Sequence, residues 1–149
     1  MSVQVIAKNR KAYRDYEILD RFDAGLVLIG TEVKSIRAGG ASLKESFARI
    51  KESEVWLENC HIAPYTHGNI QNHEPRRPRK LLLRRREINK LIGSTKKSGL
   101  TLVPLQMYLS NGRIKLELAL ARGKRKYDKR ETARRKAIQR DIETALKDR

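Results

Sequence analysis

The alternation of apolar and polar residues along the chain predicts a mainly β protein. The clearest signal is a pair of strand-like runs at 100–109 and 113–121, joined by a short turn that contains Asn111-Gly112. In the second run every other residue from Ile114 onward is Ile or Leu, which is the period of a strand with one face on a core.

Shorter strand signals lie upstream of this pair. Residues 47–50 and 55–62 flank a polar turn, and 15–30 is predicted to form a hairpin that turns at Asp23-Ala24-Gly25. These runs and the C-terminal pair give six short strands in all.

The sequence signals for helices are weaker than those for strands. Thr31 can cap a short helix over 32–38, which two glycines then end. A second helix is expected over 81–92, where apolar residues recur at helical spacing and Gly93 follows. The proline-containing stretch 63–80 is predicted to be a long loop.

Six short strands and two short helices suggest a small OB-like antiparallel barrel with short flanking helices, covering 15–121. A flat antiparallel sheet with helices on one side is the alternative. Residues 1–14 are expected to form a flexible basic arm. Residues 122–149 hold 12 basic and 5 acidic residues and few large apolar ones, so we expect a basic tail that is disordered when free and helical when bound.

The net charge of the chain indicates which class of partner it binds. The chain has 34 Lys plus Arg against 17 Asp plus Glu, a net charge of +17 and a pI of about 10.4, which is typical of a nucleic-acid binder. An anionic membrane surface is less favoured, because it would call for a basic helix with a strong apolar face. We expect no membrane partner, and a cytoplasmic location, because Cys60 stands alone and no apolar run of signal-peptide length occurs at the N-terminus.

The basic residues cluster in three places: Lys8–Lys11 with Arg14, Arg76–Lys80 with Arg84–Arg86, and Arg122–Arg130. The sequence gives only weak signals for a metal site, a reactive thiol or a catalytic site. The three histidines lie six residues apart, which does not match tight metal-ligand spacing, so no metal and no cofactor are expected. Cys60 is expected to be an inert buried thiol, and Glu32 to brace Lys34 or Arg37. No nucleophile, base and orienting group can be assembled, so we expect no enzyme.

Several segments resemble the small protein B family, the SsrA-binding proteins of bacterial trans-translation. They are Asn9-Arg10-Lys11-Ala12, Gly30-Thr31-Glu32-Val33-Lys34-Ser35-Ile36-Arg37-Ala38-Gly39, His61-Ile62-Ala63-Pro64-Tyr65, Pro75-Arg76-Arg77-Pro78-Arg79-Lys80-Leu81-Leu82-Leu83, Val103-Pro104-Leu105 and Gly123-Lys124-Arg125-Lys126-Tyr127-Asp128-Lys129-Arg130. The chain departs from the family pattern at Arg14, where many members have His, and at Asp23 and Gly40, where Glu and Lys are common.

The resemblance implies an OB-like barrel that binds the tRNA-like domain of transfer-messenger RNA (tmRNA) and carries it to stalled ribosomes. The tail would occupy the empty mRNA channel beside the decoding centre of the small subunit. A monomer is expected. The alternative is a small basic ribosomal or ribosome-assembly protein, which would share the barrel and the basic tail.

The basic clusters and the resemblance together predict two sets of site residues. The RNA-binding set is Asn9, Arg10, Lys11, Arg14, Tyr16, Glu32, Lys34, Arg37, Arg76, Arg77, Arg79, Lys80, Arg84, Gly123, Lys124 and Lys126. The ribosome-binding set in the tail is Asp128, Lys129, Arg130, Arg134, Arg135, Lys136, Ile138, Arg140 and Ile142.

Overall fold

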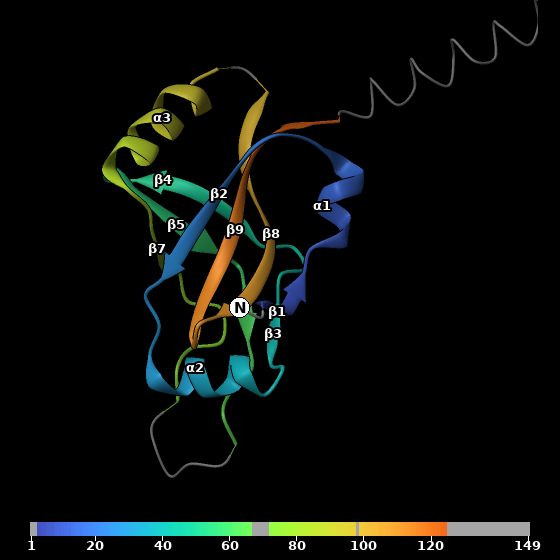
Figure 1. The fold of residues 1–149 in the computed structure, drawn as a ribbon, viewed down its shortest axis with the longest axis vertical. Coiled ribbons are helices and arrows are strands. Elements are labelled where there is room, and N and C mark those ends of the chain that lie inside the picture. Colours follow the sequence, from blue (N-terminus) through green and yellow to red (C-terminus); the bar gives the residue numbers. More distant parts are fainter. Residues whose placement is uncertain (1–2, 67–71, 98, 125–149) are drawn as a thin grey trace, which may run out of the picture.

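The computed structural model describes residues 3–66, 72–97 and 99–124 (Figure 1). The strands within these ranges are β1 (Val3–Lys8), β2 (Tyr16–Leu26), β3 (Ala41–Ser42), β4 (Phe47–Lys51), β5 (Glu54–Glu58), β6 (His61–Ile62), β7 (Arg79–Leu82), β8 (Leu100–Ser110) and β9 (Arg113–Gly123). The helices are α1 (Arg10–Asp15), α2 (Gly30–Arg37) and α3 (Arg85–Thr95).

Six of these strands close into a ring. They follow one another in the order β8-β4-β5-β7-β2-β9, and β9 pairs back onto β8. The pairings are antiparallel, and β1 adds to the ring along the end of β8 that leads into the hairpin. The prediction of a small antiparallel barrel with short helices is therefore confirmed, and the flat sheet is excluded.

The β8–β9 hairpin is the longest pairing in the barrel and was the best predicted. Asn111 and Gly112 both have positive φ, 51° and 74°, as a two-residue hairpin turn requires. Leu116 and Leu118 point into the barrel and are fully buried. β9 ends at Gly123, two residues beyond the predicted end of the strand.

The predicted hairpin over 15–30 is wrong, because β2 is one continuous strand. Asp23, Ala24 and Gly25 lie within its pairing to β9. Gly25 sits against β7, where an added Cβ would lie 3.3 Å from the Cβ of Leu82. The glycine thus permits close pairing of β2 with β7 and does not turn the chain, since long-range pairing overrides local turn propensity.

The expected flexible arm over 1–14 is also wrong for the residues that the structure describes, which form β1 and α1. Ala12 of α1 is buried against Leu105, Ala119 and Ala121, on the outer face of β8 and β9. These alanines leave room for the helix to approach the strands. A short helix of low intrinsic stability is thus fixed by packing, which the local sequence does not reveal.

Both remaining helices differ from their predicted bounds. α2 begins at Gly30, and Thr31 lies buried in its first turn, so Thr31 is not the cap. α3 begins only at Arg85, because the preceding residues pair with β5 as strand β7, and it continues through Gly93. In the described ranges, none of the helices has the length and apolar character needed to cross a bilayer.

Cys60 lies just before β6 and has no accessible surface, as predicted. Its burial raises the pKa of the thiol from 9.0 to about 11, although the nearby Arg79 charge acts in the opposite direction. The thiol is therefore protonated near neutral pH and is shielded from reagents.

We expect Cys60 in the folded protein to resist an aromatic disulfide reagent at pH 8, because the thiol is protonated and the reagent cannot reach it. Release of the coloured thiol should follow the rate of unfolding, and the same chain in denaturant should react at once. Rapid reaction of the native chain would contradict this burial.

Candidate nucleic-acid interface

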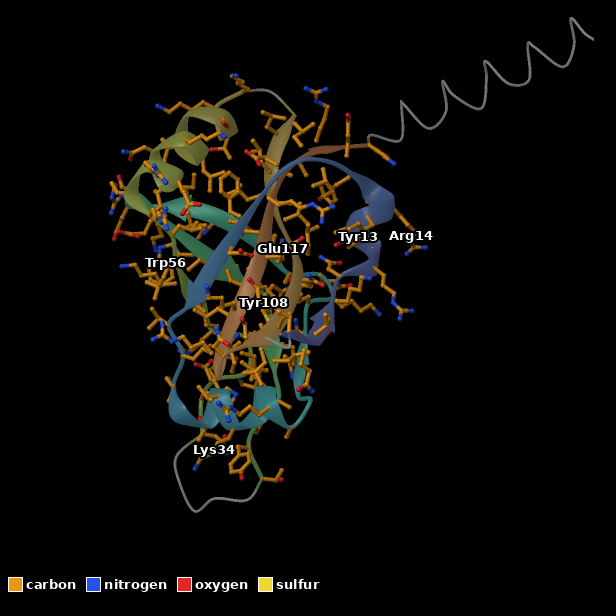
Figure 2. All side chains as sticks on the ribbon, viewed as in Figure 1. Tyr13, Arg14, Lys34, Trp56, Tyr108 and Glu117 are labelled. Atoms are coloured by element: carbon orange, nitrogen blue, oxygen red, sulfur yellow. The ribbon has the colours of Figure 1, made fainter. Side chains whose placement is uncertain are left out.

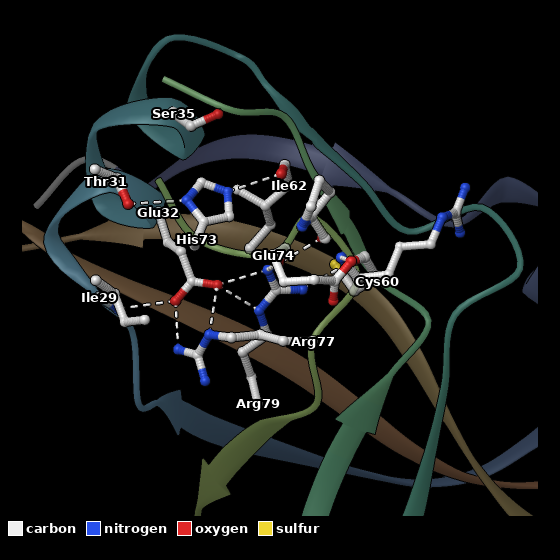
Figure 3. Close-up of polar contacts among 12 residues, drawn as sticks. Ile29, Thr31, Glu32, Ser35, Cys60, Ile62, His73, Glu74, Arg77 and Arg79 are labelled. Atoms are coloured by element: carbon white, nitrogen blue, oxygen red, sulfur yellow. Dashed lines mark hydrogen bonds and ion pairs between the residues drawn. The ribbon is translucent and has the colours of Figure 1, made fainter. Parts of the chain in front are cut away.

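Glu32 is the centre of a polar cluster at the α2 end of the barrel (Figure 3). Its carboxylate has no accessible surface. Oε1 accepts the backbone N–H of Ile29 at 2.8 Å and an N–H from Nη2 of Arg77. Oε2 accepts from Nε of Arg77 at 3.1 Å and from Nε of Arg79 at 2.6 Å. One carboxylate therefore joins the start of α2, the loop before β7 and β7 itself.

Arg79 completes this cluster from the inside. It is the first residue of β7, and its guanidinium is fully buried. Nη1 donates to the carbonyl of Cys60 at 2.5 Å, and Nη2 donates to that of Pro75 at 3.1 Å. Arg79 thus ties the loop before β7 to the residue just before β6.

The cluster is held in its ionised form. Burial of Glu32 raises its pKa, but hydrogen bonds from Arg77, Ile29 and Arg79 together outweigh burial, so the pKa of Glu32 lies below its usual value. Arg77 is partly exposed and pairs with the carboxylate through two nitrogens. The two arginines and one carboxylate leave a single positive charge near the surface.

This geometry corrects the roles expected for two RNA-binding candidates. Glu32 and Arg79 have no accessible surface, so in this conformation neither can touch RNA. Glu32 braces Arg77 and Arg79, not Lys34 or Arg37. The sequence could not reveal the pairing, because 45 and 47 residues separate Glu32 from its partners.

A second group of contacts holds the same loop and was missed by the sequence analysis. The buried His73 ring lies between the Thr31 hydroxyl, 2.9 Å from Nδ1, and the Ile62 carbonyl, 2.8 Å from Nε2. Asn72 exchanges hydrogen bonds with the backbone of Tyr65, at 2.8 and 3.0 Å. His73, considered only as a metal ligand from the sequence, is therefore a structural residue.

Exposed cations surround this cluster. Lys34 lies over the ring of Tyr65 at 5.6 Å, and Arg37 donates to the carbonyl of Gly112 at 3.1 Å. Arg76 is exposed and donates to the side chain of Asn59 at 2.9 Å. The predicted residues Lys34, Arg37 and Arg76 thus lie on the structured α2 end of the barrel.

Two further predicted cations lie along β7 and at the start of α3. Lys80 is half-buried, 3.9 Å from Glu54. Arg84 precedes α3 and is exposed, while its backbone N–H is bound by Glu87.

A second basic region lies on α1, away from Lys34 (Figure 2). Arg10, Lys11 and Arg14 are exposed on this helix. Asn9 instead is buried: its side chain accepts the N–H of Ala12 and donates to the carbonyl of Pro104 at 2.9 Å. Asn9 therefore positions the helix.

The end of β9 lies beside this second region. Tyr16 pairs with Gly123, and the backbone N–H of Lys124 donates to the carbonyl of Asp15 at 2.8 Å. The fold thus brings the predicted residues Tyr16, Gly123 and Lys124 to the base of α1. Lys126 and the predicted tail residues lie outside the described part of the chain.

Metal-ligating side chains do not gather in the described ranges: no group of three or more His, Cys, Asp or Glu could hold an ion there. The chemistry on these two surfaces is hydrogen-bond donation and positive charge. Such donors suit phosphate and ribose groups.

Comparison with known proteins gives concordant matches. The model of the family described as SmpB protein matches residues 6–148. An SsrA-binding protein of Geobacillus kaustophilus is 58% identical over 146 residues, which cover 98% of this chain and 94% of the relative. An SsrA-binding protein of Acidothermus cellulolyticus is 59% identical over 96% of this chain and 90% of its own.

Among solved structures, a chain from "tmRNA-SmpB: a journey to the center of the bacterial ribosome" superposes with a TM-score of 0.67. It is 50% identical and covers 86% of this chain and 94% of its own. The fold of this chain is therefore shared with a solved chain whose description names tmRNA, SmpB and the bacterial ribosome.

Replacing Glu32 by Gln should cost about 3–5 kcal/mol of unfolding free energy, because two arginines, one fully buried, lose their counter-charge. Because the folded pKa is lowered, the contribution of Glu32 is present above about pH 4.5 and falls as acid protonates the carboxylate. The variant should therefore also lose part of the acid sensitivity of the wild type in urea titrations at several pH values.

Glu58→Gln is the matched control, because Glu58 pairs with the exposed Arg49 at 2.7 Å on the outer face of the barrel. Its loss should be clearly smaller than that of Glu32→Gln, because the Arg49 side chain is 53% exposed and stays solvated when its partner is removed. Equal losses for the two variants would mean that the buried cluster does not hold the barrel end together.

Proposed function

The chain belongs to the SmpB protein family, and we propose that it binds the tRNA-like domain of tmRNA and delivers it to stalled ribosomes for trans-translation. In this role it is an RNA-binding adaptor of the cytoplasm. Its partners are tmRNA and the small ribosomal subunit.

The observation that carries the proposal is the near-complete match to proteins named for binding SsrA, at 58–59% identity for the relatives described above. The charge distribution supports it. Exposed cations lie on α1 and α2, two helices fixed on one barrel, and each phosphate they neutralise would release counterions. Rigid placement of separate cationic regions favours a folded RNA over a uniform rod.

Co-purification tests this function against that of a small structural ribosomal protein. The adaptor should emerge with tmRNA and should be sub-stoichiometric on ribosomes. A structural protein would be stoichiometric on one subunit whether or not tmRNA is present.

We assign the direct RNA contacts to the half-buried Lys80 and to the exposed cations of the predicted set: Arg10, Lys11, Arg14, Lys34, Arg37, Arg76, Arg84 and Lys124. Arg77 contributes little, because its guanidinium is already occupied by Glu32. Tyr16 and Gly123 shape the base of α1 where the chain leaves the barrel.

Arg76→Ala should weaken binding to the tRNA-like domain and lower the slope of log K against log salt by about 0.7 to 0.9, the loss of one phosphate contact. Arg49→Ala is the control, because Arg49 is also exposed but is paired with Glu58. Fluorescence titrations at four salt concentrations measure both variants. The same slope change in the two would contradict the assignment of Arg76.

For the tail we propose that residues from about Asp128 form a helix in the mRNA channel, with Ile138 and Ile142 on one side and Lys129, Arg130, Arg134, Arg135, Lys136 and Arg140 toward ribosomal RNA. Few large apolar residues are available to stabilise such a helix in water. Phosphates lining the channel would offset the self-repulsion of the tail.

Ala137→Pro should abolish peptide tagging on stalled ribosomes, because proline inside a helix costs about 3 kcal/mol. Affinity for isolated tmRNA should stay within a few-fold of wild type. Normal tagging by this variant would leave the tail as an anchor that acts by charge alone. In that case Ile138→Asn combined with Ile142→Asn would also be silent.

A further inference from the structure

We propose that the buried contacts of Thr31, Glu32 and His73 preorganise the loop 72–78, and that this rigidity sets the preference for tRNA-like RNA over plain duplex. The proposal rests on the function proposed above and concerns specificity within it. Thr31 and His73 are thus assigned as positioning residues, which act through the loop and touch no RNA themselves.

The loop is held at three of its residues by contacts to α2 and β6. The His73 ring is fixed by Thr31 of α2 and by the carbonyl of Ile62 in β6 (Figure 3). Glu32 of α2 binds Arg77, and the carbonyl of Pro75 accepts from the N–H of Ile62 at 2.9 Å. Every second residue from His73 to Arg77 is thus bound to α2 or β6.

The positioning residues cannot act by direct contact. Thr31 and His73 are each 6% exposed, and Glu32 is fully buried. Arg76, which lies between the anchored residues His73 and Arg77, is by contrast exposed. The buried contacts therefore fix where this guanidinium lies relative to Lys34 and Arg37 on α2.

Fixed spacing matters for one class of RNA and little for the other. A folded tRNA-like surface presents phosphates at set positions, so a loose loop must be ordered when it binds, and that ordering reduces affinity. A uniform duplex presents phosphates everywhere, and a loose cation finds one in most conformations. Loosening the loop should therefore lower the first affinity and spare the second.

Thr31→Val tests this inference, because it removes the hydroxyl that binds His73 and keeps the shape of the side chain. If only about one tenth of the molecules then keep the loop in its binding conformation, affinity for a transcript of the tRNA-like domain falls about tenfold. Affinity for an RNA duplex with the same number of phosphates should change less than twofold. The salt slope should be unchanged for both, since no cation has been removed.

Thr95→Val is the matched control. Its hydroxyl donates to the carbonyl of Leu91 at 2.8 Å in α3, at the other end of the barrel (Figure 1). It should leave the ratio of the two affinities as in wild type. Amide hydrogen exchange over 72–78 should accelerate in Thr31→Val and not in Thr95→Val, and Thr31→Ser, which keeps a hydroxyl, should restore both readouts.

The outcomes separate the two proposals. A wild-type chain with no preference for the tRNA-like transcript would overturn the proposed function. A wild type with that preference, and a Thr31→Val variant that keeps it despite faster exchange, would overturn only the positioning role. If Thr31→Val does not fold, His73→Gln removes the same hydrogen bond from the loop side, and the same ratio decides.

Discussion

The structure depends on one buried carboxylate and the two guanidinium groups that share it. Glu32 caps the backbone at the start of α2, and its oxygens also bind Arg77 and Arg79 from a distant segment. Glu32 and Arg79 are fully buried and Arg77 only partly, and burying such charges is costly unless their hydrogen bonds are nearly all made. The carbonyls of Cys60 and Pro75 supply the remaining partners of Arg79. Only one arrangement of α2, the loop before β7 and β7 satisfies all of these buried groups, so the cluster selects that arrangement.

The basic residues fall into two groups, those that are buried or paired with carboxylates and those that are available to a partner. A net charge of +17 suggests a surface uniformly suited to polyanions. The structure instead places Arg79 inside, pairs Arg77 with a carboxylate, and balances Arg49 and Arg85 against Glu58 and Glu54. The cations that we propose to contact RNA lie on α1, on the exposed part of α2, around Arg76, between β7 and α3, and just after β9. The net charge of the sequence therefore overstates the number of cations available at the interface, and it gives no information on where they lie.

Elements formed by interactions between residues close in sequence could be predicted, and elements formed by contacts between distant residues could not. The β8–β9 hairpin was predictable because its turn residues and its alternating leucines are local signals. β2 was not predictable as one strand, because its glycine allows close pairing with the distant β7. α1 was not predictable either, because it is held by packing against alanines of β9 that are far away in the sequence. Most of the exposed cations in the candidate interface were found from charge clusters, whereas His73 and the partners of Glu32 were not, since their contacts join residues more than 40 apart.

The pairing at the end of β9 has a consequence for everything that follows it in the chain. Tyr16 lies opposite Gly123, and the backbone of Lys124 is bound to that of Asp15, so the chain leaves the barrel from a fixed point at the base of α1. A segment tethered at one end explores only the volume that its length allows, and its local concentration there far exceeds that in solution. Where the barrel docks therefore limits which surfaces residues 125–149 can reach, and any contact made by the proposed tail would be strengthened by the docking of the barrel.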